Sequence, residues 1–129
     1  MRLLDKFMIG RVRCLVWNTA EQIPDTASIA LLLSGRYGVG ADRLIVLAPG
    51  GAQATRCFGA DGTPRPVDAL ARQAAALALV HTGQAMAAAA LWRSGGGSSQ
   101  TVIEYSEVRL TDSFFRRLTA SRRRMKIAG

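Results

Sequence analysis

Between residues 36 and 63 the chain alternates glycine-rich turns with apolar runs. This stretch reads RYGVGADRLIVLAPGGAQATRCFGADGT. A Gly-x-Gly-Ala-Asp turn leads into the apolar run 44–47, a Pro-Gly-Gly turn follows, and the chain returns along 54–58 to an Ala-Asp-Gly turn. Glycine and proline are typical of tight reversals of the backbone. The stretch therefore predicts two adjacent strands joined by a short turn.

The composition is that of a folded protein. A chain of 129 residues is normally one domain with a real core, and its hydrophobic fraction of 49% is not that of a disordered chain. No apolar run approaches the roughly 18 to 20 residues of a membrane span, and Arg11 and Arg13 interrupt any signal-like region. Cys14 and Cys57 lie in strand-like runs, which predicts reduced, buried thiols in a cytoplasmic protein.

The positive charge is concentrated at the C-terminal end. The chain carries a net charge of +8, and the segment 111–129 contributes +5 of it, because it holds five arginines and one lysine against a single aspartate. Such a tail can bind nucleic acid or another anionic surface. No aromatic residue lies between its arginines, whereas a surface that stacks nucleic-acid bases needs aromatic side chains there. We therefore interpret the tail first as a solvated end and second as a nucleic-acid contact.

Hydrophobic periodicity predicts the elements of the N-terminal half. Residues 2–8 and 11–17 are predicted to form two strands joined by a turn at Ile9 and Gly10, and along the second strand Arg11, Arg13, Leu15 and Trp17 alternate with Val12, Cys14 and Val16. A helix is predicted to begin after Pro24, with Asp25 or Thr26 as its N-cap. Its apolar stripe is expected to consist of Ile29, Leu32 and Leu33.

A second helix is predicted to begin at Thr63, with Pro64 in its first turn, and to run to Gly83. It is rich in alanine and apolar on most faces near its end, which is typical of a buried helix. Residues 85–92 fit either an extension of this helix or a strand. Residues 101–110 alternate as a strand does, and a short helix follows.

The two turn motifs also carry a resemblance. Arg36, Tyr37, Gly38, Val39, Gly40, Ala41 and Asp42, followed by Ala60, Asp61, Gly62 and Thr63, resemble the diaminopimelate epimerase family. In that family a helix ends in Arg-aromatic-Gly-Ile/Val-Gly-Ala-Asp, two strands follow, and Asn-Ala-Asp-Gly-Ser leads to a catalytic cysteine. The resemblance extends over about residues 1–81 and matches the N-terminal one of the family's two similar halves.

The resemblance implies an α+β fold: one half of the epimerase-like fold, with a curved mixed sheet wrapped around a central helix. Residues 1–110 would form this half domain, and residues 111–129 a short helix and the basic C-terminal tail. Because the family fold is a pseudo-dimer of two halves, a homodimer of this chain is expected.

The catalytic motif of the family is degenerate here. Family members use two cysteines, one on each half, to move a proton on a carbon next to a carboxylate, and they need no cofactor. The first cysteine position falls on about Asp68, which leaves that aspartate as a weak catalytic candidate. Residues 69–71 replace the Gly-Asn-Gly that follows the cysteine, and Gly59 replaces the substrate-binding asparagine. We therefore expect no catalytic residue.

A ligand site is nevertheless expected where the family substrate lies. The resemblance places Arg13, Arg43, Gly59 and Asp68 there, and the two arginines favour a small anionic ligand. A metal site is not expected, because one histidine and two dispersed cysteines form no ligand cluster.

Three further residues have simple structural interpretations. His81 is expected to stabilise the C-terminal end of its helix rather than act as a base. Asp42 and Asp61 are expected to close Asx turns.

These observations predict a non-catalytic, cytoplasmic epimerase-like protein that acts by binding or self-assembly, with no membrane contact. Two alternatives stay open. One is a residual amino-acid isomerase of the lysine-biosynthesis type, with a site across a homodimer interface. The other is a nucleic-acid-binding protein that uses the basic tail.

Overall fold

The computed structural model describes residues 2–18, 22–47 and 55–118. These residues form one six-stranded mixed sheet with the order β5-β4-β3-β2-β1-β6, in which only β2 and β3 run parallel. The strands are β1 Arg2–Ile9, β2 Val12–Trp17, β3 Arg43–Val46, β4 Arg56–Gly59, β5 Pro64–Arg65 and β6 Ile103–Leu110. The helices are α1 Thr26–Leu33, α2 Ala69–His81 and α3 Ala85–Ser94, and residues 112–118 are also helical. The predicted α+β class is confirmed.

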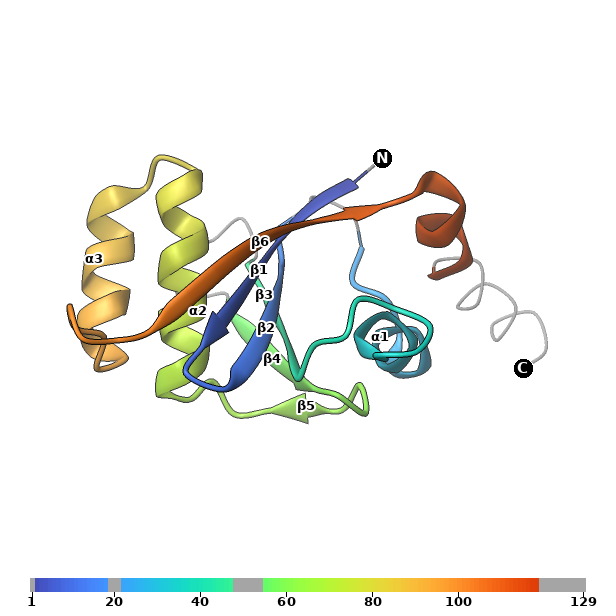
Figure 1. Ribbon diagram of the computed structural model, residues 1–129, viewed down its shortest axis with the longest axis horizontal. Helices are drawn as coiled ribbons and strands as arrows, with labels where there is room; N and C mark the ends of the chain where they lie inside the picture. Colours follow the sequence, from blue (N-terminus) through green and yellow to red (C-terminus); the bar gives the residue numbers. More distant parts are fainter. Residues whose placement is uncertain (1, 19–21, 48–54, 119–129) are drawn as a thin grey trace.

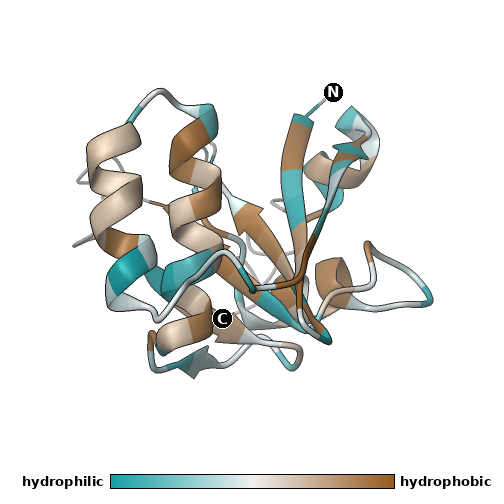
Figure 2. Cartoon of the chain, turned by 60° about the vertical axis from the view of Figure 1, so that its left-hand side comes forward, coloured by the Kyte–Doolittle hydropathy of each residue, from teal (hydrophilic) through white to brown (hydrophobic). Residues whose placement is uncertain are grey.

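Helices cover both faces of the sheet (Figure 1). On one face, α2 and α3 pack over apolar side chains of β1 to β4, among them Phe7, Val16 and Ile45. The buried positions of α2 are Ala71, Ala74, Ala75, Ala76, Ala78 and Leu79. The pair α2 and α3 is pale to deep brown along most of its length in Figure 2, as expected of helices with a wide apolar surface.

The opposite face packs against α1 and residues 112–118. Asp25 caps α1 by accepting a hydrogen bond from the Ser28 N–H at 2.8 Å, and the predicted stripe of α1 is buried. Phe115 stacks on Trp17 with 5.6 Å between the ring centroids. The helical residues 112–118 therefore belong to the same core as the sheet. The rest of the predicted basic tail, residues 119–129, lies outside the described residues.

The predicted start of the second helix at Thr63 and Pro64 is wrong. Residues Pro64–Arg65 form strand β5, which pairs with β4. The reason is Pro66, since its ring drives the preceding residue out of the helical region and into an extended conformation. The helix begins only after Asp68, whose carboxylate accepts a hydrogen bond from the Ala71 N–H at 2.9 Å.

The ambiguous segment after Gly83 is a separate helix. Gly83 has a φ of 78° and ends α2, and α3 then turns back along it. Helix α2 thus has the sheet on one side and α3 on another. The predicted Pro-Gly-Gly turn between β3 and β4 lies outside the described residues. In the described part of the chain, no helix has the length and apolar character needed to cross a membrane.

Candidate functional site

A cleft of about 360 Å³ opens where β3, β4 and β5 meet the beginning of α2. Three of the four ligand-binding residues that the resemblance suggested line it together: Arg43, Gly59 and Asp68. The other lining residues are Asp42, Ala60, Arg65 and Pro66. The cleft therefore combines two cations, two carboxylates and a glycine backbone within one small volume.

The centre of the cleft is an ion pair between the sheet and the helix. Nη1 of Arg43 lies 2.8 Å from Oδ1 and 2.7 Å from Oδ2 of Asp68. Asp68 at the same time caps α2 through the Ala71 N–H. The Asp68 carboxylate thus caps the helix and also binds Arg43. Because both contacts are charge-assisted or made to the backbone, they restrict the position of the guanidinium.

These contacts set the ionisation of Asp68. Burial acts to raise its pKa, but the hydrogen bond from Ala71 and the nearby Arg43 guanidinium outweigh burial, so the pKa is lowered. Asp68 is therefore a carboxylate at neutral pH. A carboxylate with a lowered pKa and two existing partners is a poor general base.

A side chain at Gly59 would have to displace the Arg65 side chain that lies against it. A Cβ at this position would lie 2.7 Å from Nε of Arg65 and 3.2 Å from Oδ1 of Asp61. Arg65 also pairs with Asp61 at 3.3 Å, and it lines the cleft beside Gly59. The sequence reasoning missed Arg65. Its signal was the Pro-Arg-Pro run, which marks an extended segment rather than a helix start.

Arg13 does not line the cleft but supports it through Asp42. The Asp42 carboxylate accepts hydrogen bonds from the Arg13 N–H at 2.8 Å and from its guanidinium at 3.4 and 3.3 Å. These bonds hold the pKa of Asp42 below its usual value. Asp42 therefore bridges two strands instead of closing the predicted Asx turn. Asp61 does close one, since its carboxylate accepts from the Thr63 N–H at 3.1 Å.

Two buried thiols lie on the α2 face of the sheet, near the Arg43–Asp68 pair. Cys14 and Cys57 are free and buried, as predicted. Burial raises the pKa of Cys14 to about 12 despite the opposing charge of Arg43, and it also raises the pKa of Cys57. A thiolate is the reactive form of cysteine, so both residues are suited to packing rather than to proton transfer.

The only histidine of the chain lies at the other end of α2. His81 places Nδ1 3.1 Å from one carboxylate oxygen of Asp5, and the Tyr105 hydroxyl donates to the other oxygen at 2.9 Å. The helix end itself is capped by Thr82, whose hydroxyl donates to the Leu79 carbonyl at 2.9 Å. His81 thus stands in the last turn as expected, and its partner is a side chain from β1.

Neither metal binding nor similarity to known proteins defines the site further. Among the described residues, no three or more histidine, cysteine, aspartate or glutamate side chains gather where they could hold a metal ion. No protein-family model matches the chain, and no curated protein matches it. The function therefore has to be argued from the chemistry of the cleft.

Proposed function

We propose that this chain is a non-catalytic diaminopimelate epimerase-like protein that binds a small amino-acid-like anion in the cleft at the start of α2. The observation that supports the proposal best is the convergence of Arg43, Gly59 and Asp68, three positions suggested by the resemblance, on one cavity. Arg43 and Arg65 would bind the carboxylate of the ligand, and Asp42 would face its ammonium group.

Arg43 is equipped for this role because only part of its guanidinium is used. Both of its contacts to Asp68 leave from Nη1. A guanidinium carries five N–H donors, so the donors on Nε and Nη2 can form a bidentate pair with a ligand carboxylate. The Asp68 contact prevents Arg43 from moving freely, which lowers the entropy cost of binding.

The ionisation of the side chains supports binding without catalysis. A family reaction needs a thiolate or another base next to the α-carbon of the ligand. The raised pKa values of the two buried cysteines and the lowered pKa of Asp68 all act against such a base. The residual-isomerase alternative would need a lower pKa at one of the two thiols or a higher pKa at Asp68.

Binding can be tested with a matched pair of ligands. The ¹⁵N-labelled protein is titrated with meso-diaminopimelate and with cadaverine, the same carbon chain without its carboxylates. We expect the amides of Gly59, Ala60 and Asp68 to shift with the first ligand only. Arg43→Gln should weaken binding by about tenfold or more, since it removes a charge-assisted contact. Arg56→Gln, an equal charge change outside the cleft lining, is the control.

Equal shifts with cadaverine, or equal weakening by both variants, would contradict the assigned site. The same sample tests the absence of catalysis. The protein is incubated with LL-diaminopimelate in heavy water, and the α-proton signal is followed by NMR. We expect no protein-dependent exchange. Exchange that Asp68→Ala abolishes would favour the isomerase instead.

Self-assembly is the second candidate function, and the outer surface of α2 and α3 favours it. A groove of about 230 Å³ there is lined by alanines together with Leu77, Val80 and Trp92. Val80 is 58% exposed and Met86 is 89% exposed, which is unusual for large apolar side chains. We propose this surface as the contact of a homodimer.

Light scattering at micromolar concentration tests the dimer. We expect twice the mass of the chain, and Val80→Lys should return it to the monomer because it places a charge in an apolar contact. Leu31→Lys on α1, which is 37% exposed on the other side of the sheet, is the matched control. A monomeric wild-type protein would remove this candidate.

The remaining expectations depend on residues or compartments outside the described structure. Nucleic-acid binding through the tail stays a less favoured alternative, because no aromatic residue lies between its arginines. Arg122, Arg123, Arg124 and Lys126 lie outside the described residues. A cytoplasmic location is supported by two free, buried thiols and stays a proposal.

A further inference from the structure

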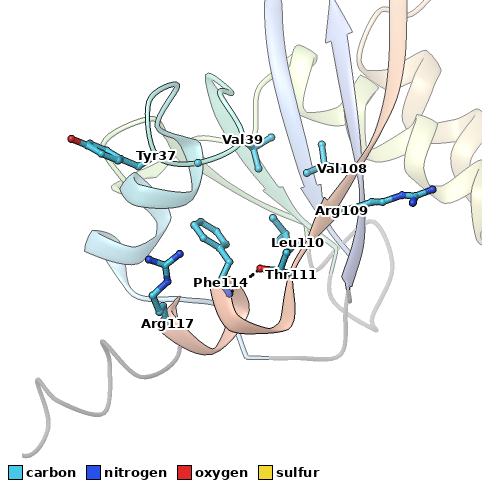
Figure 3. Close-up of a pocket in the computed structure, with 9 residues that line it drawn as sticks. Tyr37, Val39, Val108, Arg109, Leu110, Thr111, Phe114 and Arg117 are labelled. Atoms are coloured by element: carbon cyan, nitrogen blue, oxygen red, sulfur yellow. Dashed lines mark hydrogen bonds between the residues drawn. The ribbon is translucent and has the colours of Figure 1, made fainter.

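A second pocket, of about 300 Å³, lies on the α1 face of the sheet, away from the cleft (Figure 3). It opens between the loop after α1, the end of β6 and the helical residues 112–118. Val39, Val108, Leu110 and Phe114 turn toward the same space, so its interior is apolar. The volume is at the lower end of the roughly 300 to 1,000 Å³ typical of small-molecule sites.

The loop wall of this pocket is held rigidly. The Val39 N–H donates to the Leu32 carbonyl at 2.7 Å, and Gly38 and Gly40 both donate to the Ser34 carbonyl. A side chain at Gly38 would collide with the backbone carbonyls of α1, so the loop lies directly on the helix end. The backbone on this side of the pocket is therefore already in position before any ligand arrives.

The opposite wall is anchored equally well. Leu118 and Phe115 are buried in the core, and the Ser28 hydroxyl of α1 donates to the Leu118 carbonyl at 3.0 Å. The Thr111 hydroxyl accepts a hydrogen bond from the Phe114 N–H at 3.2 Å, which fixes the turn from β6 into residues 112–118. Both walls thus belong to the packed body of the protein.

The rim of the pocket is positive. The Arg117 guanidinium lies 5.4 Å from the centre of the Phe114 ring, and Arg117 is one of the residues that line the pocket. Nζ of Lys6 approaches the Val39 carbonyl at 3.5 Å beside the pocket. None of the residues that line the pocket, all within the described part of the chain, is acidic. These features favour a ligand that carries an apolar body and a negative group.

We propose that this pocket binds a small monocarboxylic acid with an aromatic or branched apolar body. The body would contact Phe114, Val39 and Leu110, and the carboxylate would pair with Arg117. An arginine stacked on an aromatic ring keeps its N–H edge available for a carboxylate. This site differs from the cleft at α2, where carboxylates of the protein itself balance each arginine.

The test uses indole-3-acetate and its neutral isostere indole-3-acetamide as probes, followed by ¹⁵N NMR of the full chain. We expect indole-3-acetate to shift the amides of Val39, Val108 and Thr111, and the acetamide to bind about tenfold more weakly. Arg117→Gln should weaken the binding of indole-3-acetate by about tenfold and leave the binding of indole-3-acetamide unchanged. Arg116→Gln, an equal charge change that does not line the pocket, should leave both unchanged.

Phe114→Ala provides an independent readout, because it should weaken both probes alike by removing the apolar contact. A thermal melt of each variant confirms that it is folded. Equal affinity of acid and amide, equal weakening by Arg116→Gln and Arg117→Gln, or shifts confined to other residues at millimolar probe would each overturn the proposal.

Discussion

On the face of the sheet covered by α2 and α3, five of the six buried positions of α2 are alanines. On the face covered by α1, the buried side chains are large, among them Trp17, Leu32, Leu44 and Phe58. Small side chains let a helix lie close to the sheet, whereas large ones fill a wider gap by interdigitating. The two faces therefore differ in which substitutions they tolerate.

The pockets on the two faces also differ, in the way that their charged side chains are paired. At the cleft beside α2, Asp68 at the start of the helix contacts Arg43 of β3 directly, so the charges are paired. At the pocket on the other face, large apolar side chains line the space and Arg117 stays on the rim. The paired charges of the cleft predict a ligand that carries both a positive and a negative group. The positive rim of the other pocket predicts an anion with an apolar body.

The largest effect is expected on the face with large side chains. Trp17 is 1% exposed and stacks on Phe115. Trp17→Ala should lower the free energy of unfolding by about 3 to 5 kcal/mol, because it leaves a cavity between the sheet and residues 112–118. Urea unfolding measures the change. A loss under about 1 kcal/mol would mean that this face is not tightly packed.

An overpacking substitution tests the other face. Ala74 is fully buried between α2 and the sheet, so Ala74→Leu should destabilise the protein by about 1 to 3 kcal/mol. Ala87→Leu adds the same atoms to the exposed surface of α3 and serves as the control, with little expected change. If both variants unfold at the same urea concentration as the wild type, the close approach of α2 to the sheet is wrong.

The smallest effect is a pH dependence on the alanine-rich face. Because the pKa of Cys14 is raised from 9.0 to about 12, the folded state keeps a proton that the unfolded state loses above pH 9. The contribution of the protonated Cys14 thiol to the free energy of unfolding is therefore complete below pH 9. It falls between pH 9 and about 12, by at most about 1.4 kcal/mol per pH unit. Comparing urea unfolding of the wild type and Cys14→Ala at pH 8 and pH 10 isolates this slope. Equal slopes would show that the thiol is not buried.

Several elements could be predicted because their signals are local. The strands β1 and β2, the Asp25 cap and the stripe of α1 could all be predicted from short stretches of sequence. The strand β5 was missed because Pro64 after a threonine also looks like a helix start, and Pro66 decided the outcome. The segment of α3 was ambiguous because a short run of alanines fits more than one environment.

The candidate site was predictable only in part. The resemblance led to Arg43, Gly59 and Asp68, which the fold brings to one cleft. Arg65 was missed, and Arg13 proved to act through Asp42. A motif identifies positions along the chain, but the partner of each charge depends on which strands are neighbours.

The sequence by itself determined many of the apolar core positions and the two buried thiols, because these follow from side-chain chemistry and short-range periodicity. The α+β class came from the two turn motifs and the family that they resemble. Only the tertiary structure decided that Tyr105 meets Asp5 and that Arg43 meets Asp68. It also decided that residues 112–118 close a pocket against the loop after α1. Such contacts join segments far apart in the chain, and they form because each element must bury the apolar face that its neighbours leave uncovered.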